Sequence, residues 1–146
     1  MVKPRTNINV MEGGEITDAV QVISSLLTPV ATGNVTFSRY RNAALLATPI
    51  AVKASAGAIY GISIYNPNDE VSFVKLYNIA QASVTVGTSA VYRTWAVAAG
   101  DTLVIPPQLL PIDVFSTAIT VAATKLLADN DTTAPDVGMA VQITYL

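Results

Sequence analysis

The chain has 146 residues, with 8 Lys and Arg against 10 Asp and Glu, a formal net charge of −2, and no cysteine or histidine. This length fits one domain with its own core. The lack of cysteine excludes disulfides and thiolate metal sites, and the lack of histidine removes the usual general base and the commonest metal ligand. Charged residues make up 12% of the chain, about half the average share, so we expect partners to cover much of the uncharged surface.

Residues 1–34 are predicted to form an extended N-terminal arm that serves assembly. The stretch "MVKPRTNINVMEGGE" combines a proline, two adjacent glycines and mixed charges without a sustained period. A short helix over residues 17–27 is one interpretation of the next stretch, with Thr17 as its N-cap and Pro29 beyond its end. A strand is the alternative, because β-branched residues are dense there.

The sequence predicts neither a signal peptide nor a membrane-spanning helix, so we expect no membrane contact. Lys3 and Arg5 are not followed by an apolar stretch. The longest uncharged run, residues 19–38, is interrupted by Pro29 and Gly33 and therefore cannot supply the ~20 apolar residues that a spanning helix needs.

From residue 35 onward, short segments alternate apolar and polar residues, which is the period of a half-buried strand. Turn residues separate them, notably Asn66, Asn68, Gly87 and Gly100. Eight strands are predicted, over residues 35–40, 49–55, 58–65, 71–77, 90–97, 102–106, 114–122 and 137–146. Residues 35–146 are therefore predicted to form an all-β, antiparallel β-sandwich of the Greek-key or jelly-roll kind.

The first predicted strand contains "FSRYR", in which Arg39 and Arg41 flank Tyr40. Such a pattern can bind nucleic acid if the arginines hold phosphates while a base stacks on the ring. We favour the other interpretation, two solvated arginines at a strand end, because the chain is net negative and has no wider basic stripe. Nucleic-acid binding is therefore not expected.

Trp95 lies in the fifth predicted strand and alternates with Val91 and Val97, which indicates a core or inter-sheet position. Arg93 falls on the same face and does not fit a core. A partner could cover this strand instead.

The segment "DNDTTAPDVG" gathers Asp129, Asp131 and Asp136. It fails the calcium-loop pattern, because Thr133 stands where an oxygen ligand belongs and Ala134 where the glycine belongs. Asp, Asn and Thr also favour turns by bonding their own backbone. We interpret the Asp129–Asp136 segment as a solvated turn and predict no metal ligand in it.

The final strand shows the clearest alternation. One face carries five apolar or aromatic residues and the other carries polar or small ones; the first set is Val137, Met139, Val141, Ile143 and Tyr145. This strand is expected to complete the sandwich.

Catalytic patterns are lacking across the chain: serine has no histidine to accept its proton, and neither a GxSxG elbow nor a phosphate-binding glycine loop occurs. A pair of carboxylates could in principle serve a glycosidase, but nothing singles out a pair. We therefore predict no enzyme activity, no cofactor, and no catalytic, cofactor-binding or metal residue.

Three stretches together resemble a recurrent pattern in small virion proteins of tailed bacteriophages. They are "YNPNDEVSFVKLYN", "VGTSAVYRTWAVAAGDTLVIPP" and "VFSTAITVAATKLLADNDTTAPDVG", and the resemblance as a whole covers about Ile59 to Leu146. The resemblance implies a β-sandwich component of the particle: a capsid decoration (cement) protein, or a domain of a head fibre or tail appendage.

The resemblance also implies a homo-oligomer, with a trimer the first choice, that binds the major capsid protein or other virion proteins. Such a protein would be made in the host cytoplasm and would lie on the capsid surface of the virion. The alternative from another class is a carbohydrate-binding sandwich, which would require Tyr60, Tyr65, Tyr92 and Tyr145 to gather on one open surface.

Overall fold

The computed structural model describes residues 36–146, which form strands and one short 3-10 helix, η2 (Gln81–Ser83). The strands are β1 (Ser38–Leu45), β2 (Ile50–Lys53), β3 (Gly57–Tyr65), β4 (Ser72–Tyr77), β5 (Arg93–Val97), β6 (Thr102–Ile105), β7 (Asp113–Phe115), β8 (Ile119–Thr124) and β9 (Met139–Tyr145). The predicted arm over residues 1–34 and the helix or strand predicted over residues 17–27 lie outside the described residues.

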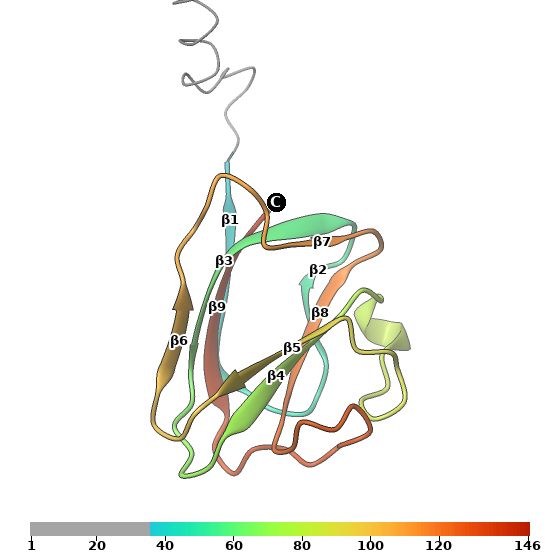
Figure 1. Ribbon diagram of the computed structural model, residues 1–146. Coiled ribbons are helices and arrows are strands. Elements are labelled where there is room, and N and C mark those ends of the chain that lie inside the picture. The colour runs from blue at the N-terminus through green and yellow to red at the C-terminus, as the bar shows by residue number, and fades with distance from the viewer. Residues whose placement is uncertain (1–35) are drawn as a thin grey trace, which may run out of the picture. The chain divides into compact units, whose positions relative to one another are not determined.

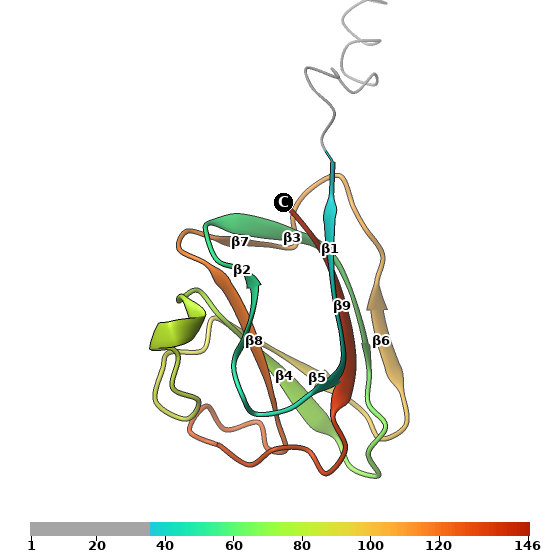
Figure 2. The same ribbon diagram turned by 180° about the vertical axis from the view of Figure 1, so that it is seen from behind.

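Two antiparallel sheets pack face to face (Figure 1 and Figure 2). The first sheet has the order β1-β9-β3-β6, with β7 also paired to β3, and the second has the order β2-β8-β4-β5. With the short β7 set aside, two four-stranded sheets connected in this way have the jelly-roll topology. The predicted all-β sandwich is confirmed, and of the two kinds considered the structure has the jelly roll.

The prediction of a single strand over residues 114–122 is wrong. The structure has two strands there, β7 in the first sheet and β8 in the second, separated by residues 116–118. Asn78 holds the break: its Nδ2 donates to Ser116 Oγ at 2.9 Å and its Oδ1 accepts from Thr117 N at 2.8 Å. At this point the chain crosses from the first sheet to the second. Both β7 and β8 contain buried residues, so the run of apolar residues continues across the break and does not mark the crossing.

The predicted alternation of the last strand is confirmed within β9, where Met139, Val141 and Ile143 are buried and Gln142 is exposed. Val137 precedes β9 and is 53% exposed, so the buried face begins at Met139, two residues later than predicted. β9 lies between β1 and β3 and pairs with both. It therefore forms the middle of the first sheet.

A bulge in β1 keeps its buried face directed inward. The pairing passes from Asn42 opposite Val141 to Leu45 opposite Met139, which adds one residue to β1. Asn42 Oδ1 accepts from Ala44 N at 2.8 Å, and this bond shapes the bulge. Because of the extra residue, Leu45 faces the core and is fully buried.

The core lies between the sheets and is built almost entirely of aliphatic side chains. Its members are Leu45, Val52, Ile59, Ile62, Ile64, Val74, Leu76, Val97, Phe115, Ile119, Val121, Ala123, Met139, Val141 and Ile143. Both neighbouring strands β4 and β8 are buried on both faces, whereas half-buried strands are predicted. The difference arises because the segments after β4 and β8 fold back over the outer face of the second sheet.

Candidate functional site

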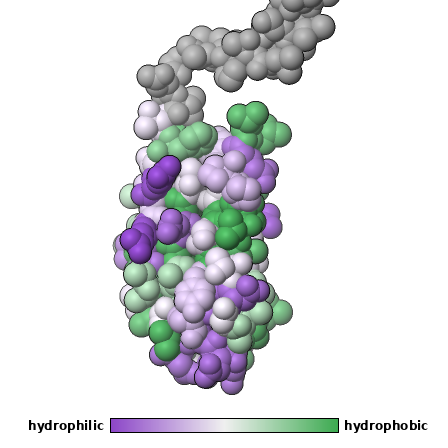
Figure 3. Space-filling model, turned by 90° about the vertical axis from the view of Figure 1, so that its left-hand side faces the viewer, coloured by the Kyte–Doolittle hydropathy of each residue, from purple (hydrophilic) through white to green (hydrophobic). Residues whose placement is uncertain are grey.

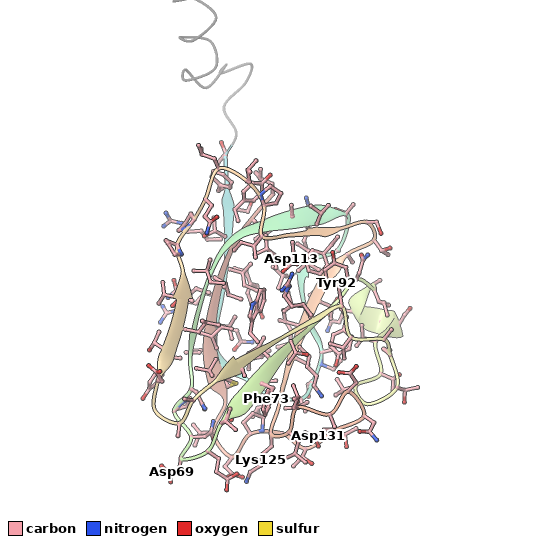
Figure 4. The ribbon with its side chains drawn as sticks, viewed as in Figure 1. Asp69, Phe73, Tyr92, Asp113, Lys125 and Asp131 are labelled. Carbon is pink, nitrogen blue, oxygen red and sulfur yellow. The ribbon has the colours of Figure 1, made fainter. Side chains whose placement is uncertain are left out.

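The acidic segment belongs to the loop between β8 and β9, residues 125–138, which covers part of that outer face. Lys75 projects from β4 under the loop, and its Nζ donates to Ala128 O at 2.5 Å. Within the loop, Lys125 N donates to Thr133 O at 2.8 Å. Figure 4 shows the loop with Lys125 and Asp131 at the end of the molecule that also carries Asp69.

Asp131 organises this loop. Its Oδ2 accepts from Leu126 N at 2.8 Å and its Oδ1 from Thr133 N at 3.0 Å. Burial alone would raise the pKa of Asp131, but the backbone hydrogen bonds from Thr133 and Leu126, with the nearby charge of Lys75, lower the pKa below its ordinary value of 3.8. The predicted turn is confirmed, although Asp131 is only 9% exposed and is therefore not solvated.

The other two acids point elsewhere. Asp136 accepts from Lys125 Nζ at 2.8 Å, and Asp129 is exposed. Within residues 36–146, no three acidic side chains come close enough together to hold a metal ion. The geometry instead assigns Asp131 to the turn and Asp136 to a surface ion pair.

We expect the Asp131→Asn variant to lose about 1–3 kcal/mol of unfolding free energy at pH 7, because the amide can no longer accept from both backbone N–H groups. A folded-state pKa below the ordinary value means that the stabilisation by Asp131 is complete above about pH 4 and is lost as the pH falls through the folded-state pKa. Urea unfolding at pH 7 and at lower pH should therefore show the variant and the wild type converging in acid. Asp129→Asn is the control, and a similar loss in it would contradict this role.

Lys75 and Tyr77 lie on the same outer face of β4 and are fully buried. Burial lowers the pKa of the Lys75 ammonium, against the attraction of Asp131 and Asp129, and burial also raises the pKa of Tyr77. Among residues 36–146, no partner lies within hydrogen-bond distance of the Tyr77 hydroxyl. The loop covers Lys75 through its contact with Ala128, and the charge of Asp129 on this loop also raises the pKa of Tyr77.

Two buried asparagines join the loops at the same end of the sandwich. Asn66 Nδ2 donates to the carbonyl oxygens of Glu70, Val97 and Ala98 at 2.8, 2.9 and 3.1 Å. Asn68 Nδ2 donates to Asn66 Oδ1 at 2.7 Å and to the carbonyl oxygen of Val137 in the β8–β9 loop. In return, the N–H of Val137 donates to Asn68 Oδ1. The β3–β4, β5–β6 and β8–β9 connections are thereby fixed to one another.

The arginines of "FSRYR" lie on the outer face of the first sheet, separated from the tyrosine between them. Tyr40 faces inward and packs against the core, while Arg39 and Arg41 are exposed. Tyr40 is therefore not placed to hold a base between the two guanidinium groups. This placement supports the interpretation as solvated arginines.

The same two arginines form one wall of a groove of about 370 Å³ on this face. Gly61, Ser63, Gln142 and Thr144, which are small or polar, form its floor on β3 and β9, and the far wall carries Val104, Pro106 and Pro107. A smaller hollow next to it shares Arg41, Ser63 and Gln142 and extends the groove toward Tyr65. Figure 3 shows this side of the molecule, where hydrophilic and hydrophobic residues lie next to one another.

The sequence identifies the arginines of this groove but not its opposite wall. Gln142 and Thr144 are predicted on the outer face of the last strand, and the structure places them there. The contribution of Val104 depends on β6 lying beside β3, which is a long-range pairing. Alternation within β6 shows only that Val104 faces away from the core.

The four tyrosines required for the carbohydrate alternative do not share one surface. Tyr145 packs against the core, and Tyr60 stacks edge-on against Phe37 with ring centroids 4.9 Å apart. Tyr92 lies before β5, stacks on a buried phenylalanine and donates through its hydroxyl to a backbone carbonyl at 2.8 Å. At least Tyr145 and Tyr92 are therefore engaged in packing of their own and do not form one open row with the others.

Trp95 packs against the core, as predicted. Arg93 shares its strand and its guanidinium lies 5.9 Å from the ring centroid of Trp95. Arg93 Nε also lies 2.8 Å from Oδ1 and 2.6 Å from Oδ2 of Asp113, which is buried in β7. Arg93 therefore neutralises a buried carboxylate and connects β5 of the second sheet to β7 of the first.

These features define the described part of the chain as an all-β jelly roll with an open groove and a closed loop end. Within residues 36–146, no helix is long and apolar enough to cross a membrane. No family model and no curated protein matches the sequence. A crystal structure of PirA is similar at a TM-score of 0.34 and 10% identity, over 80% of this chain and 99% of that chain, a level of likeness that carries no argument about function.

Proposed function

We propose that the chain is a structural virion protein of a tailed bacteriophage, specifically a capsid decoration protein that stabilises the head through protein–protein contacts. The observation that carries the proposal is a pair of leucines displayed on a fixed loop. Leu109 is 92% exposed and Leu110 is 76% exposed. Adjacent leucines this exposed on one loop offer an apolar contact surface to a partner, and loops commonly carry binding residues.

The loop that carries these leucines connects β6 to β7 and is held at both ends by β3. Gln108 N donates to Tyr60 O at 3.0 Å, and Ile112 N donates to Ile59 O at 2.6 Å. Pro106, Pro107 and Pro111 further restrict its backbone. An anchored loop loses less entropy when a partner covers it, which favours its use in binding.

Other observations support the same proposal. The jelly roll is used by viral capsid proteins and also by lectins, and because a fold alone does not define a function, the resemblance of residues 59–146 to phage virion proteins supplies the distinction. The chain has no histidine, and the groove offers only guanidinium, amide, hydroxyl and apolar groups. The proposed protein has no enzymatic role, and the resemblance further implies that it lies on the capsid surface and assembles as a homotrimer.

The test uses the double variant Leu109→Ser/Leu110→Ser. We expect it to unfold at nearly the same temperature as the wild type, because both side chains are exposed, and to bind undecorated phage capsids at least tenfold more weakly in a co-sedimentation assay. Leu126→Ser/Leu127→Ser, on the β8–β9 loop, is the matched control, since these leucines are 57% and 61% exposed at another site.

Two results of that assay would refute the proposal in its stated form. If the wild-type protein does not pellet with capsids but binds purified tails or fibres, the protein belongs to an appendage. If both double variants bind as well as the wild type, the leucine loop is not the attachment surface.

A further inference from the structure

The groove on the outer face of the first sheet has a charge that nothing within the described residues neutralises. Arg93 pairs with Asp113, and Lys125 pairs with Asp136 and lies 3.7 Å from Glu70. No carboxylate of residues 36–146 lies within ion-pair distance of Arg39 or Arg41. These two arginines therefore present their charge to whatever enters the groove.

The strand register places the groove residues in regular rows across the sheet. Arg41 lies opposite Gln142, which lies opposite Ser63, which in turn lies opposite Val104. A second row begins with Arg39 and continues through Thr144 to Gly61, where an added Cβ would lie 2.9 Å from the Cα of Pro107. Each row thus runs from a cation through small or polar residues to an apolar wall.

The spacing of the rows matches an extended peptide. Arg39 and Arg41 are two residues apart on one strand face, so their Cα atoms lie about 6.7 Å apart, which is also the distance between alternate side chains of an extended chain. In the first row, Arg41 and Val104 are three strand spacings of about 4.8 Å apart, which leaves room for one such chain between them. In that position, alternate side chains would point to the arginines and the intervening ones to Val104 and the prolines.

We propose that this groove binds an extended acidic peptide segment of a partner protein, with carboxylates at alternate positions and apolar side chains between them. The carboxylates pair with Arg39 and Arg41, since guanidinium groups hold carboxylates through two parallel hydrogen bonds. The side chains of Ser63, Gln142 and Thr144 supply hydrogen bonds to the peptide backbone. The inference goes beyond attachment to the capsid and does not depend on it.

The composition of the groove favours a peptide over the other anionic polymers. Single-stranded nucleic acid is bound where bases stack on aromatic rings. Tyr40 between the two arginines packs against the core, and Tyr65 lies only in the smaller hollow beyond Arg41. The wall opposite the arginines carries valine and proline, which suit apolar side chains.

The experiment measures fluorescence anisotropy of a labelled eight-residue peptide with alternating Glu and Val, titrated with full-length protein at low salt. We expect saturable binding by the wild type and at least fivefold weaker binding by Arg41→Gln. Lys53→Gln is the control, because it removes the same charge from β2 in the other sheet. We expect the affinity of this variant for the peptide to stay within twofold of the wild type. Thermal unfolding of each variant checks that the fold is retained.

A second peptide of the same composition has its four Glu residues contiguous and should bind at least threefold more weakly. The proposal is overturned if the alternating peptide shows no saturable binding, if Lys53→Gln weakens binding as much as Arg41→Gln, or if the two peptides bind equally well. Tighter binding of an oligothymidylate of equal length would instead assign the groove to nucleic acid.

Discussion

The Asn66→Asp variant is expected to lose about 3–5 kcal/mol of unfolding free energy, a large fraction of the about 5–15 kcal/mol that stabilises a typical domain. The two side chains have nearly the same shape, so the change tests hydrogen bonding and charge alone. Asn66 Nδ2 donates to the carbonyl oxygens of Glu70, Val97 and Ala98. An aspartate oxygen in its place would face these three acceptors while carrying a buried charge.

Urea unfolding at pH 7 measures this loss, and Asn130→Asp provides the control. Asn130 is exposed, so the same chemical change there should alter the unfolding free energy by less than about 0.5 kcal/mol. Hydrogen exchange should also accelerate at Gly100 N and Val137 N, which bond to Asn68 in the same cluster. A loss below about 1 kcal/mol in Asn66→Asp would mean that the asparagines do not hold the three connections together.

The second large effect is expected at the contact between the turn at Gly87 and the β8–β9 loop. Gly87 has φ 88°, and a Cβ added there would lie 2.5 Å from Thr132 Cγ2 and 3.0 Å from Asn130 O. Gly87→Ala therefore combines the cost of a left-handed backbone, about 1–2 kcal/mol, with an overpacking cost of about 1–3 kcal/mol.

Two further variants separate these costs. Gly100 has φ 67° with no atom within 4 Å of an added Cβ, so Gly100→Ala should show the backbone cost alone. Thr132→Ser removes the methyl group in question and should recover part of the stability in the Gly87→Ala background while changing the wild type little. If Gly87→Ala and Gly100→Ala are equally destabilising, the turn does not pack against the loop.

The strands were largely predictable because their signal is local. Each strand that buries one face shows it in its own alternation, as β9 does with Met139, Val141 and Ile143. β4 does not follow this rule: Phe73 and Lys75 alternate with core residues and are nevertheless buried. The β8–β9 loop returns over Lys75, whose Nζ donates to Ala128 O. Such coverage depends on contacts between segments more than 50 positions apart, as from Lys75 to Ala128, which local periodicity does not contain.

The candidate site was predictable only in part, for the same reason. The pattern "FSRYR" identifies Arg39 and Arg41, and strand alternation separates them from Tyr40. The opposite wall of the groove comes from Val104 and Pro107, which reach it through the pairing of β3 with β6. For the acidic loop, the turn-forming residues around Asp131 were enough to predict its conformation. The burial of Lys75 beneath the loop was not predictable, because nothing in the sequence around Lys75 indicates it.

We proposed that the chain is a capsid decoration protein, and a cryo-electron microscopy map of purified particles of the virus that encodes it tests this proposal most directly. Our account predicts density for jelly-roll subunits of 15.3 kDa on the outer surface of the head, grouped in threes. Each subunit should face the capsid with the loop that displays Leu109 and Leu110. Density confined to the neck, tail or fibres, or particles that lack the protein altogether, would contradict the claim.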